Sequence, residues 1–209
     1  MFTAIGRLKR FLVTPETSKH RIFIWCAKGV IPDKNLVVIA KDDDTCFGSV
    51  QSRFHAAWAL RLGTSLEDRP RYTSSTTFRT FAFPETLTPN ITAAEYADNP
   101  RAVAIAEAAR RLNELREAWI NPPDLVERVP EVVPGYPDRI VPISPKAAAT
   151  LKKRTLTNLY NERPAWLDNA HRELDAAVAA AYRWPVDIGD EDALALLLEL
   201  NRERATAGR

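Results

Sequence analysis

The 209-residue sequence is poor in the features that mark secreted and membrane-spanning proteins. It has two cysteines, Cys26 and Cys46, which cannot form a disulfide framework, so a reducing compartment is indicated. No apolar run approaches the ~20 residues that a transmembrane helix needs, and the N-terminus has no signal-peptide pattern. We therefore expect a soluble, cytoplasmic protein without a membrane partner.

Glycine is also scarce, and the catalytic motifs that depend on it are missing. The 7 glycines are scattered, and none forms the glycine-rich turn after a strand that holds a nucleotide or a methyl donor. No Asp or Glu is followed two positions later by Lys, the pattern usual in metal-dependent nuclease cores. Residues 121–124 (NPPD) resemble the Asn-Pro-Pro-aromatic loop of amino-methylating DNA methyltransferases, but an Asp replaces the aromatic residue that stacks on a flipped base. We interpret this segment as a helix stop and expect no catalytic residue in the chain.

Two groups of side chains have the chemistry of metal ligands but not the spacing. His20, Cys26, Cys46 and His55 would make a four-ligand zinc set, yet they contain no Cys-x-x-Cys pair. Residues 42–44 are three consecutive aspartates, whereas hard-cation loops space their ligands apart. Buried thiols, hydrogen-bonded imidazoles and a solvated turn before a helix are the expected roles, so we predict no metal site.

The charges are distributed unevenly along the chain. Residues 1–90 carry 13 Lys and Arg against 8 Asp and Glu, whereas residues 91–209 carry 16 against 19. A basic front half joined to a mildly acidic rear half is typical of a polyanion-binding module with a scaffold behind it. The excess is small and supports nucleic-acid binding only weakly.

The residue pattern predicts an α+β protein with a β-rich, mixed front domain over residues 1–90. Residues 10–14, 21–27 and 35–40 are rich in β-branched and aromatic residues and are expected to form strands. One helix is expected over 47–63, ending at a left-handed Gly63, with a strand over 76–83. Val50, Phe54 and Trp58 should form the buried stripe of that helix.

The rear domain, residues 91–209, is expected to be an all-helical bundle. Thr92 and Glu95 form a capping box, and a long helix should begin at Asn99–Pro100. Seven of the 15 prolines lie between residues 122 and 145, so residues 121–145 should be an extended connection. Helices should resume near Lys146 and continue to the C-terminus.

Arginines and small hydroxyl side chains concentrate in the front half. Guanidinium groups and hydroxyls bind phosphates and base edges, so these residues are candidates for contacts to nucleic acid. The alternative is an ordinary solvated surface, which is about equally common for such clusters. The candidates are Lys19, His20, Arg21, Ser52, Arg53, Arg69, Arg71, Thr73, Ser74, Ser75, Thr76 and Arg79.

Five ordered runs of the sequence resemble a known family. They are residues 52–63 (SRFHAAWALRLG), 70–84 (PRYTSSTTFRTFAFP), 112–122 (LNELREAWINP), 156–167 (LTNLYNERPAWL) and 170–185 (AHRELDAAVAAAYRWP). Together they are similar to the target-recognition domain and helical C-terminal domain of class I S-adenosylmethionine-dependent adenine-N6 DNA methyltransferases of the MmeI restriction–modification type. Ala82 departs from the family, which tends to have proline there.

The resemblance implies double-stranded DNA as a partner, and a methyltransferase catalytic domain or subunit as a possible second one. It also implies that the S-adenosylmethionine site and the catalytic loop lie in a domain that this chain lacks, so we expect no cofactor here. A protein-interaction adaptor, or an inert remnant without DNA binding, stays open as an alternative. A standalone nuclease is a weaker third.

Overall fold

A three-stranded antiparallel sheet begins the fold. The computed structural model describes residues 2–66 and 69–207. After the short helix α1 (Phe2–Ile5), strand β1 (Arg10–Pro15) lies between β2 (Ile24–Ala27) and β3 (Leu36–Ile39). The register pairs Leu12 with Trp25 on one side and with Ile39 on the other. The three predicted strands are therefore confirmed, the second and third being shorter than expected.

Two helices replace the single helix expected over residues 47–63. Helix α2 (Asp44–Gln51) ends at Ser52, whose backbone is extended at φ −66° and ψ 156°, and α3 (Arg53–Leu62) begins after it. The Ser52 hydroxyl accepts the His55 N–H and donates to the Ser49 carbonyl, which stabilises the break. The prediction that Gly63 takes a left-handed conformation is also wrong, because its φ is −71°. The stripe of Val50, Phe54 and Trp58 is buried as predicted.

The segment after α3 also differs from the expectation. Strands β4 (Thr64–Leu66) and β5 (Arg69–Arg71) pair antiparallel, and a π-helical turn, η1 (Ser74–Phe78), follows. The Thr77 hydroxyl donates to the Thr73 carbonyl within this turn. The strand predicted over 76–83 is therefore wrong: short hydroxyl side chains here satisfy the backbone locally instead of leaving it for a sheet partner.

Helix α2 packs against two long helices of the rear half. The capping box before η2 (Ala93–Tyr96) is confirmed, and α4 (Pro100–Ile120) begins after Asn99 as predicted. Gly48 of α2 faces α4 and α7 (Ala165–Tyr182) so closely that a β-carbon there would lie 2.5 Å from Cγ2 of Ile105 and 3.1 Å from Cδ1 of Leu174. One hydrophobic core consequently runs from Leu12 in the front half to Leu197 near the C-terminus.

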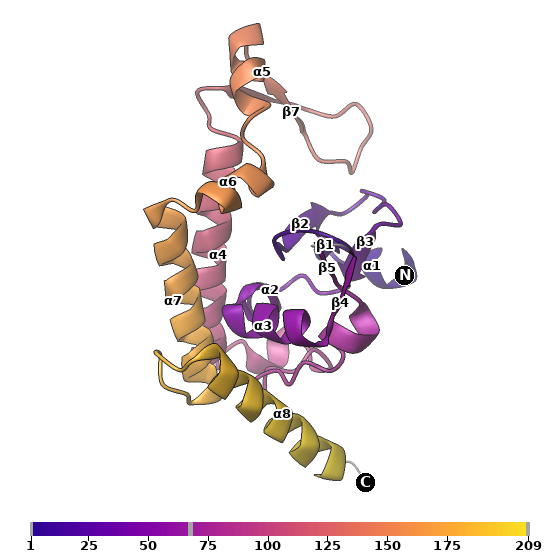
Figure 1. Cartoon of the computed structure of the whole chain (residues 1–209). Coiled ribbons are helices and arrows are strands. Elements are labelled where there is room, and N and C mark those ends of the chain that lie inside the picture. The colour runs from indigo at the N-terminus through magenta and orange to yellow at the C-terminus, as the bar shows by residue number, and fades with distance from the viewer. Residues whose placement is uncertain (1, 67–68, 208–209) are drawn as a thin grey trace.

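Helices predominate in the described part of the rear half, residues 91–207, and a hairpin interrupts them. The proline-rich connection contains β6 (Val126–Val129) paired with β7 (Arg139–Pro142), which corrects the all-helical expectation. Helices α5 (Pro145–Leu151), α6 (Leu156–Glu162), α7 and α8 (Asp190–Ala207) follow. Figure 1 shows α4 and α7 side by side, with α5, α6 and the hairpin at one end and α8 at the other.

The α+β fold class is confirmed, while the division at residue 90 stays a prediction. No helix in residues 2–66 and 69–207 is long and apolar enough to cross a bilayer.

Candidate nucleic-acid interface

A pocket of about 300 Å³ lies where the front half meets α6 and α7. Its position follows from backbone pairing, because residues 16–18 run beside residues 70–72. The Tyr72 N–H donates to the Glu16 carbonyl over 2.7 Å, and Thr17 forms a bridge with Arg71. This pairing brings the loop before β2 next to the end of β5. Five of the twelve candidate residues line the pocket: Lys19, His20, Arg21, Arg53 and Arg71.

Lys19 and His20 contact the rear half through one amide. Asn161 Oδ1 lies 2.7 Å from Lys19 Nζ and 2.9 Å from His20 Nε2. The His20 ring also lies 5.9 Å, centroid to centroid, from that of Tyr160. Lys19 is exposed and has only this neutral acceptor within the described residues. Its charge is therefore free to meet an anion.

Arg21 and Arg71 occupy different electrostatic environments. The Arg21 guanidinium donates to the Thr14 hydroxyl and to the Pro15 and Pro70 carbonyls, and it lies 4.9 Å from the centre of the Tyr72 ring. Burial lowers the pKa of Arg21 to about 10, so the group is cationic at neutral pH. Arg71 is exposed and pairs with the Glu16 carboxylate at 2.6 Å.

Arg53 connects α3 to the end of the chain. Its guanidinium donates to the Ile188 carbonyl over 2.6 Å and pairs with Asp190, the first residue of α8. Its backbone N–H donates to Asp175 Oδ1 over 2.8 Å. Burial raises the pKa of Asp175 to about 6, with the Arg53 N–H opposing the shift. Asp175 is the one carboxylate on the described lining of the pocket.

The other candidates do not line the pocket. Ser52 is a correction: it is 0% exposed and its hydroxyl caps α3, so it cannot contact a duplex in this conformation. Exposed positions in η1 hold Ser74, Ser75 and Thr76, and Arg79 is exposed directly after it. The candidates outside the pocket, besides Ser52, are Arg69, Thr73, Ser74, Ser75, Thr76 and Arg79.

Sequence reasoning missed the rear-half residues of the pocket. Arg163 ends α6 in a left-handed conformation, φ 42°, and donates to Asp168 over 2.9 Å. Tyr160 and His171 are hydrogen-bonded at 2.9 Å, and burial lowers the pKa of His171 to about 4, so it is neutral. The Arg-Pro step at residues 163–164 was the only local signal, since it predicts a turn after α6.

Arg116 of α4 lies behind the pocket wall and is 1% exposed. Its guanidinium donates to Gln51 Oε1 and the Tyr160 hydroxyl, each over 3.2 Å, and to the Phe23 carbonyl over 3.0 Å. Its Nε has no hydrogen-bond partner within residues 2–66 and 69–207. A fully buried guanidinium that has only neutral partners is unusual, since isolated buried charge is costly.

The residues weighed as metal ligands have other roles. Asp43 caps α2 through the Cys46 N–H at 2.7 Å, and Asp44 pairs with Arg10 at 2.9 Å. His55 is buried beside Tyr72. The structure contains no group of three or more His, Cys, Asp or Glu arranged to hold a metal ion in the part of the chain that it describes.

Comparison with known proteins relates the chain to one family. Residues 3–85 match the family model described as MmeI, target recognition domain. The chain is also similar to the solved structure of the Type IIL restriction–modification enzyme MmeI in complex with DNA, with 20% sequence identity and a TM-score of 0.65. That match covers 96% of this chain and 22% of the MmeI chain, so this chain spans about a fifth of the enzyme's length. No curated protein sequence matches. The predicted resemblance to the MmeI target-recognition domain is thus confirmed over residues 3–85, and the rest of the chain shares the fold of that structure.

Proposed function

We propose that this chain, whose residues 3–85 match the MmeI target-recognition domain, is the DNA-recognition part of an MmeI-like restriction–modification enzyme. One observation carries the proposal: the five candidate residues around the pocket all fall within the matched segment and all come from its basic loops and helix. As part of such an enzyme the chain would work in the cytoplasm.

Contacts to the DNA would divide between two regions of the front half. Lys19 and Arg71 are exposed residues of the pocket lining and would bind backbone phosphates, which set the register of the protein on the duplex. Ser74, Ser75 and Arg79 have exposed side chains with no hydrogen bond or ion pair within the described residues, so their donors are available for base edges. The rear helices would hold this surface rigid through the shared core.

Methylation would require a further domain, in which S-adenosylmethionine supplies the methyl group for adenine N6. The residues present here do not fit that cofactor. Strands β1, β2 and β3 are antiparallel, and none of the described strands leads through a glycine-rich turn into a helix, the arrangement that binds such cofactors. We derive no catalytic step for this chain.

Salt-dependent duplex binding tests the proposal. Fluorescence anisotropy with a labelled mixed-sequence duplex should show log affinity falling linearly with log salt. Lys19→Ala should weaken binding on every sequence and reduce the salt slope by about 1, because one phosphate contact is lost. The control is Lys146→Ala, which removes an exposed lysine from α5. Binding that is insensitive to salt, or equal behaviour of the two variants, would contradict the proposal.

A protein-interaction adaptor is the second candidate, favoured by exposed apolar side chains of the rear half. Val132 is 85% exposed and Val133 53% exposed in the connection between β6 and β7, and Ile143 after β7 is 54% exposed. Exposed apolar side chains that form a patch often mark protein contacts, and Val132 and Val133 are at least consecutive in the chain. A folded chain that binds no duplex even at low salt would favour this function over DNA recognition.

A further inference from the structure

The pocket between the loop before β2, α3 and the α6–α7 turn carries more positive charge than its ion pairs cancel. Five cationic side chains line it and face one lining carboxylate, Asp175. Three of the five, those of Arg53, Arg71 and Arg163, pair with carboxylates outside the lining. Lys19 and Arg21 have only amide, hydroxyl and carbonyl acceptors within the described residues.

Arg116, behind the wall, is a further cation without a carboxylate partner in the described part of the chain. Two of its acceptors, Gln51 and Tyr160, are themselves lining residues, so its guanidinium is one side chain away from the pocket. Low dielectric around a buried charge extends its influence compared with water. An anion in the pocket would offset the cost of burying Arg116, for which the described part of the chain offers no carboxylate.

The donors and the walls select a class of ligand. Guanidinium forks bind both carboxylates and phosphates, and a phosphate has enough oxygens to accept from several of these donors at once. Beside them, Ala56, Leu60 and Pro70 give the pocket an apolar side that would contact a sugar or a base. Its volume of about 300 Å³ is at the low end of small-molecule sites, which run from ~300 to 1,000 Å³.

We infer that this pocket binds the phosphate of one nucleotide, and that Arg163, from the rear half, is one of its ligands. The inference deepens the proposed function and rests on it for the source of the nucleotide, which would be the bound DNA. It also extends the recognition surface beyond the segment that matches the target-recognition domain, because Arg163 and Asn161 lie outside residues 3–85.

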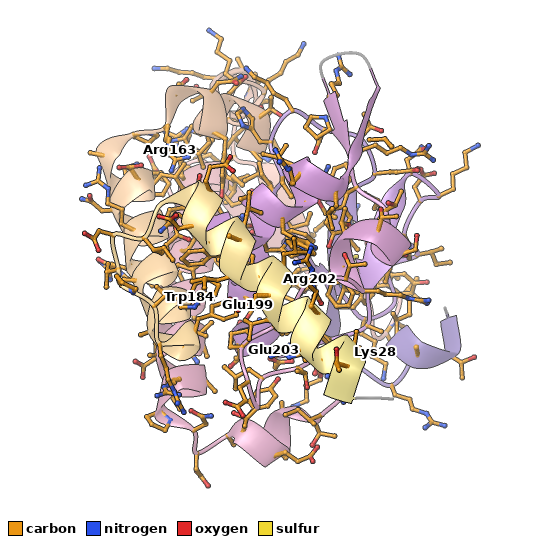
Figure 2. All side chains as sticks on the ribbon, turned by 60° about the horizontal axis from the view of Figure 1, so that its bottom comes forward. Lys28, Arg163, Trp184, Glu199, Arg202 and Glu203 are labelled. Atoms are coloured by element: carbon orange, nitrogen blue, oxygen red, sulfur yellow. The ribbon has the colours of Figure 1, made fainter. Side chains whose placement is uncertain are left out.

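A matched pair of variants isolates the role of Arg163. Asp168 accepts from both Arg163 and Arg172, but only Arg163 lines the pocket. Figure 2 labels Arg163, the pocket arginine of this pair. Arg163→Gln and Arg172→Gln each remove one ion pair to the same carboxylate, so any difference between them comes from the pocket.

The experiment uses the full chain and three probes: inorganic phosphate, a deoxynucleoside monophosphate and duplex DNA. Binding of the small probes is followed by NMR titration, and binding of the duplex by anisotropy. We expect both small probes to shift the amide signals of residues 18–21 and 160–163, with the monophosphate binding more tightly. Arg163→Gln should weaken the binding of the monophosphate and of the duplex about tenfold, whereas Arg172→Gln should bind both with wild-type affinity.

Each outcome separates the pocket from the proposed function. If Arg163→Gln and Arg172→Gln bind phosphate equally well, the inference of a phosphate pocket is overturned. Duplex binding that falls with Lys19→Ala but not with Arg163→Gln overturns the pocket and leaves DNA recognition standing. Monophosphate binding that needs Arg163, without any duplex binding, supports the pocket with a free nucleotide as the source and overturns the proposed function. No binding of any probe overturns both.

Discussion

Protonation of His55 should destabilise the fold in mild acid. The ring is 0% exposed, its Nδ1 donates to the Val50 carbonyl over 2.9 Å, and its Nε2 therefore accepts from the Tyr72 hydroxyl at 3.2 Å. A second proton would charge a buried ring and remove the acceptor of Tyr72. Burial, the larger effect, lowers the pKa of His55 to about 3, against 6.5 for a free side chain.

The sign and size of the effect follow from linkage. Because the folded pKa is below the unfolded one, the unfolded state takes up the proton first, and stability is lost as pH falls from 6.5 towards 3. Over this whole pH interval, protonation of His55 lowers the free energy of unfolding by about 5 kcal/mol. About 1.4 kcal/mol of that is already lost at pH 5.5. His171, with a pKa lowered to about 4, should lose a similar amount by pH 5.5.

Urea denaturation followed by tryptophan fluorescence at pH 7.5 and pH 5.5 measures this loss. His55→Asn keeps a donor for the Val50 carbonyl but has no group that titrates, so its stability should fall about 1.4 kcal/mol less than that of the wild type between the two pH values. The variant also loses packing, but it loses the same amount at both pH values, so this loss drops out when the two free energies of unfolding are subtracted. The reasoning fails if His55→Asn loses as much stability as the wild type.

Three further substitutions test the packing and charges around the site. Gly48→Ala should destabilise the fold by about 1–3 kcal/mol in urea denaturation, because its methyl group would overlap Ile105. The same change at exposed Gly189, where the added β-carbon would make only an ordinary contact at 3.7 Å, should not produce this loss. Arg116→Ala should cost about 3 kcal/mol in the same assay, since it leaves a cavity and unpaired acceptors. Asp175→Asn should raise stability by about 1–2 kcal/mol at pH 7.5 but not at pH 4. The pKa of Asp175 is about 6 in the folded state and 3.8 in the unfolded state, so its ionisation lowers stability as the pH rises from 3.8 to 6.

Local patterns predicted the elements whose determinants lie within a few residues. Residues 10–14 formed a strand, and Asn99–Pro100 began α4, because β-branched runs and helix caps act locally. The burial of Arg116 could have been predicted from the same kind of local pattern, but it was not. It follows Ile105, Ala109 and Leu112 at helical spacing on the buried face of α4, so periodicity alone places it in the core.

Ser52 shows a local signal that supports two structures. A serine between Val50 and Phe54 continues an amphipathic helix pattern, but its hydroxyl can equally cap a new helix. The choice depends on whether α2 and α3 pack better straight or bent. That depends on the surroundings of Gly48, which has room for no side chain between α4 and α7. Gly48 meets Ile105 and Leu174, both more than fifty positions away, so the packing that accompanies the break is not contained in the local sequence.

The rear side of the pocket could not be predicted either, because it is formed by contacts between residues that are even farther apart in the sequence. Lys19 and Asn161 are 142 positions apart, and no periodicity within one element connects them. They meet because the chain turns back between α4 and α7, through the β6–β7 hairpin, and α6 then returns beside the front half (Figure 1). The proline-rich sequence predicted that α4 would stop but not the direction of the return, which is set by how α7 packs on α4. The basic surface predicted from one half of the chain thus became a pocket lined by residues from both halves, and the position of Arg163 on that lining is the part that only the three-dimensional structure supplies.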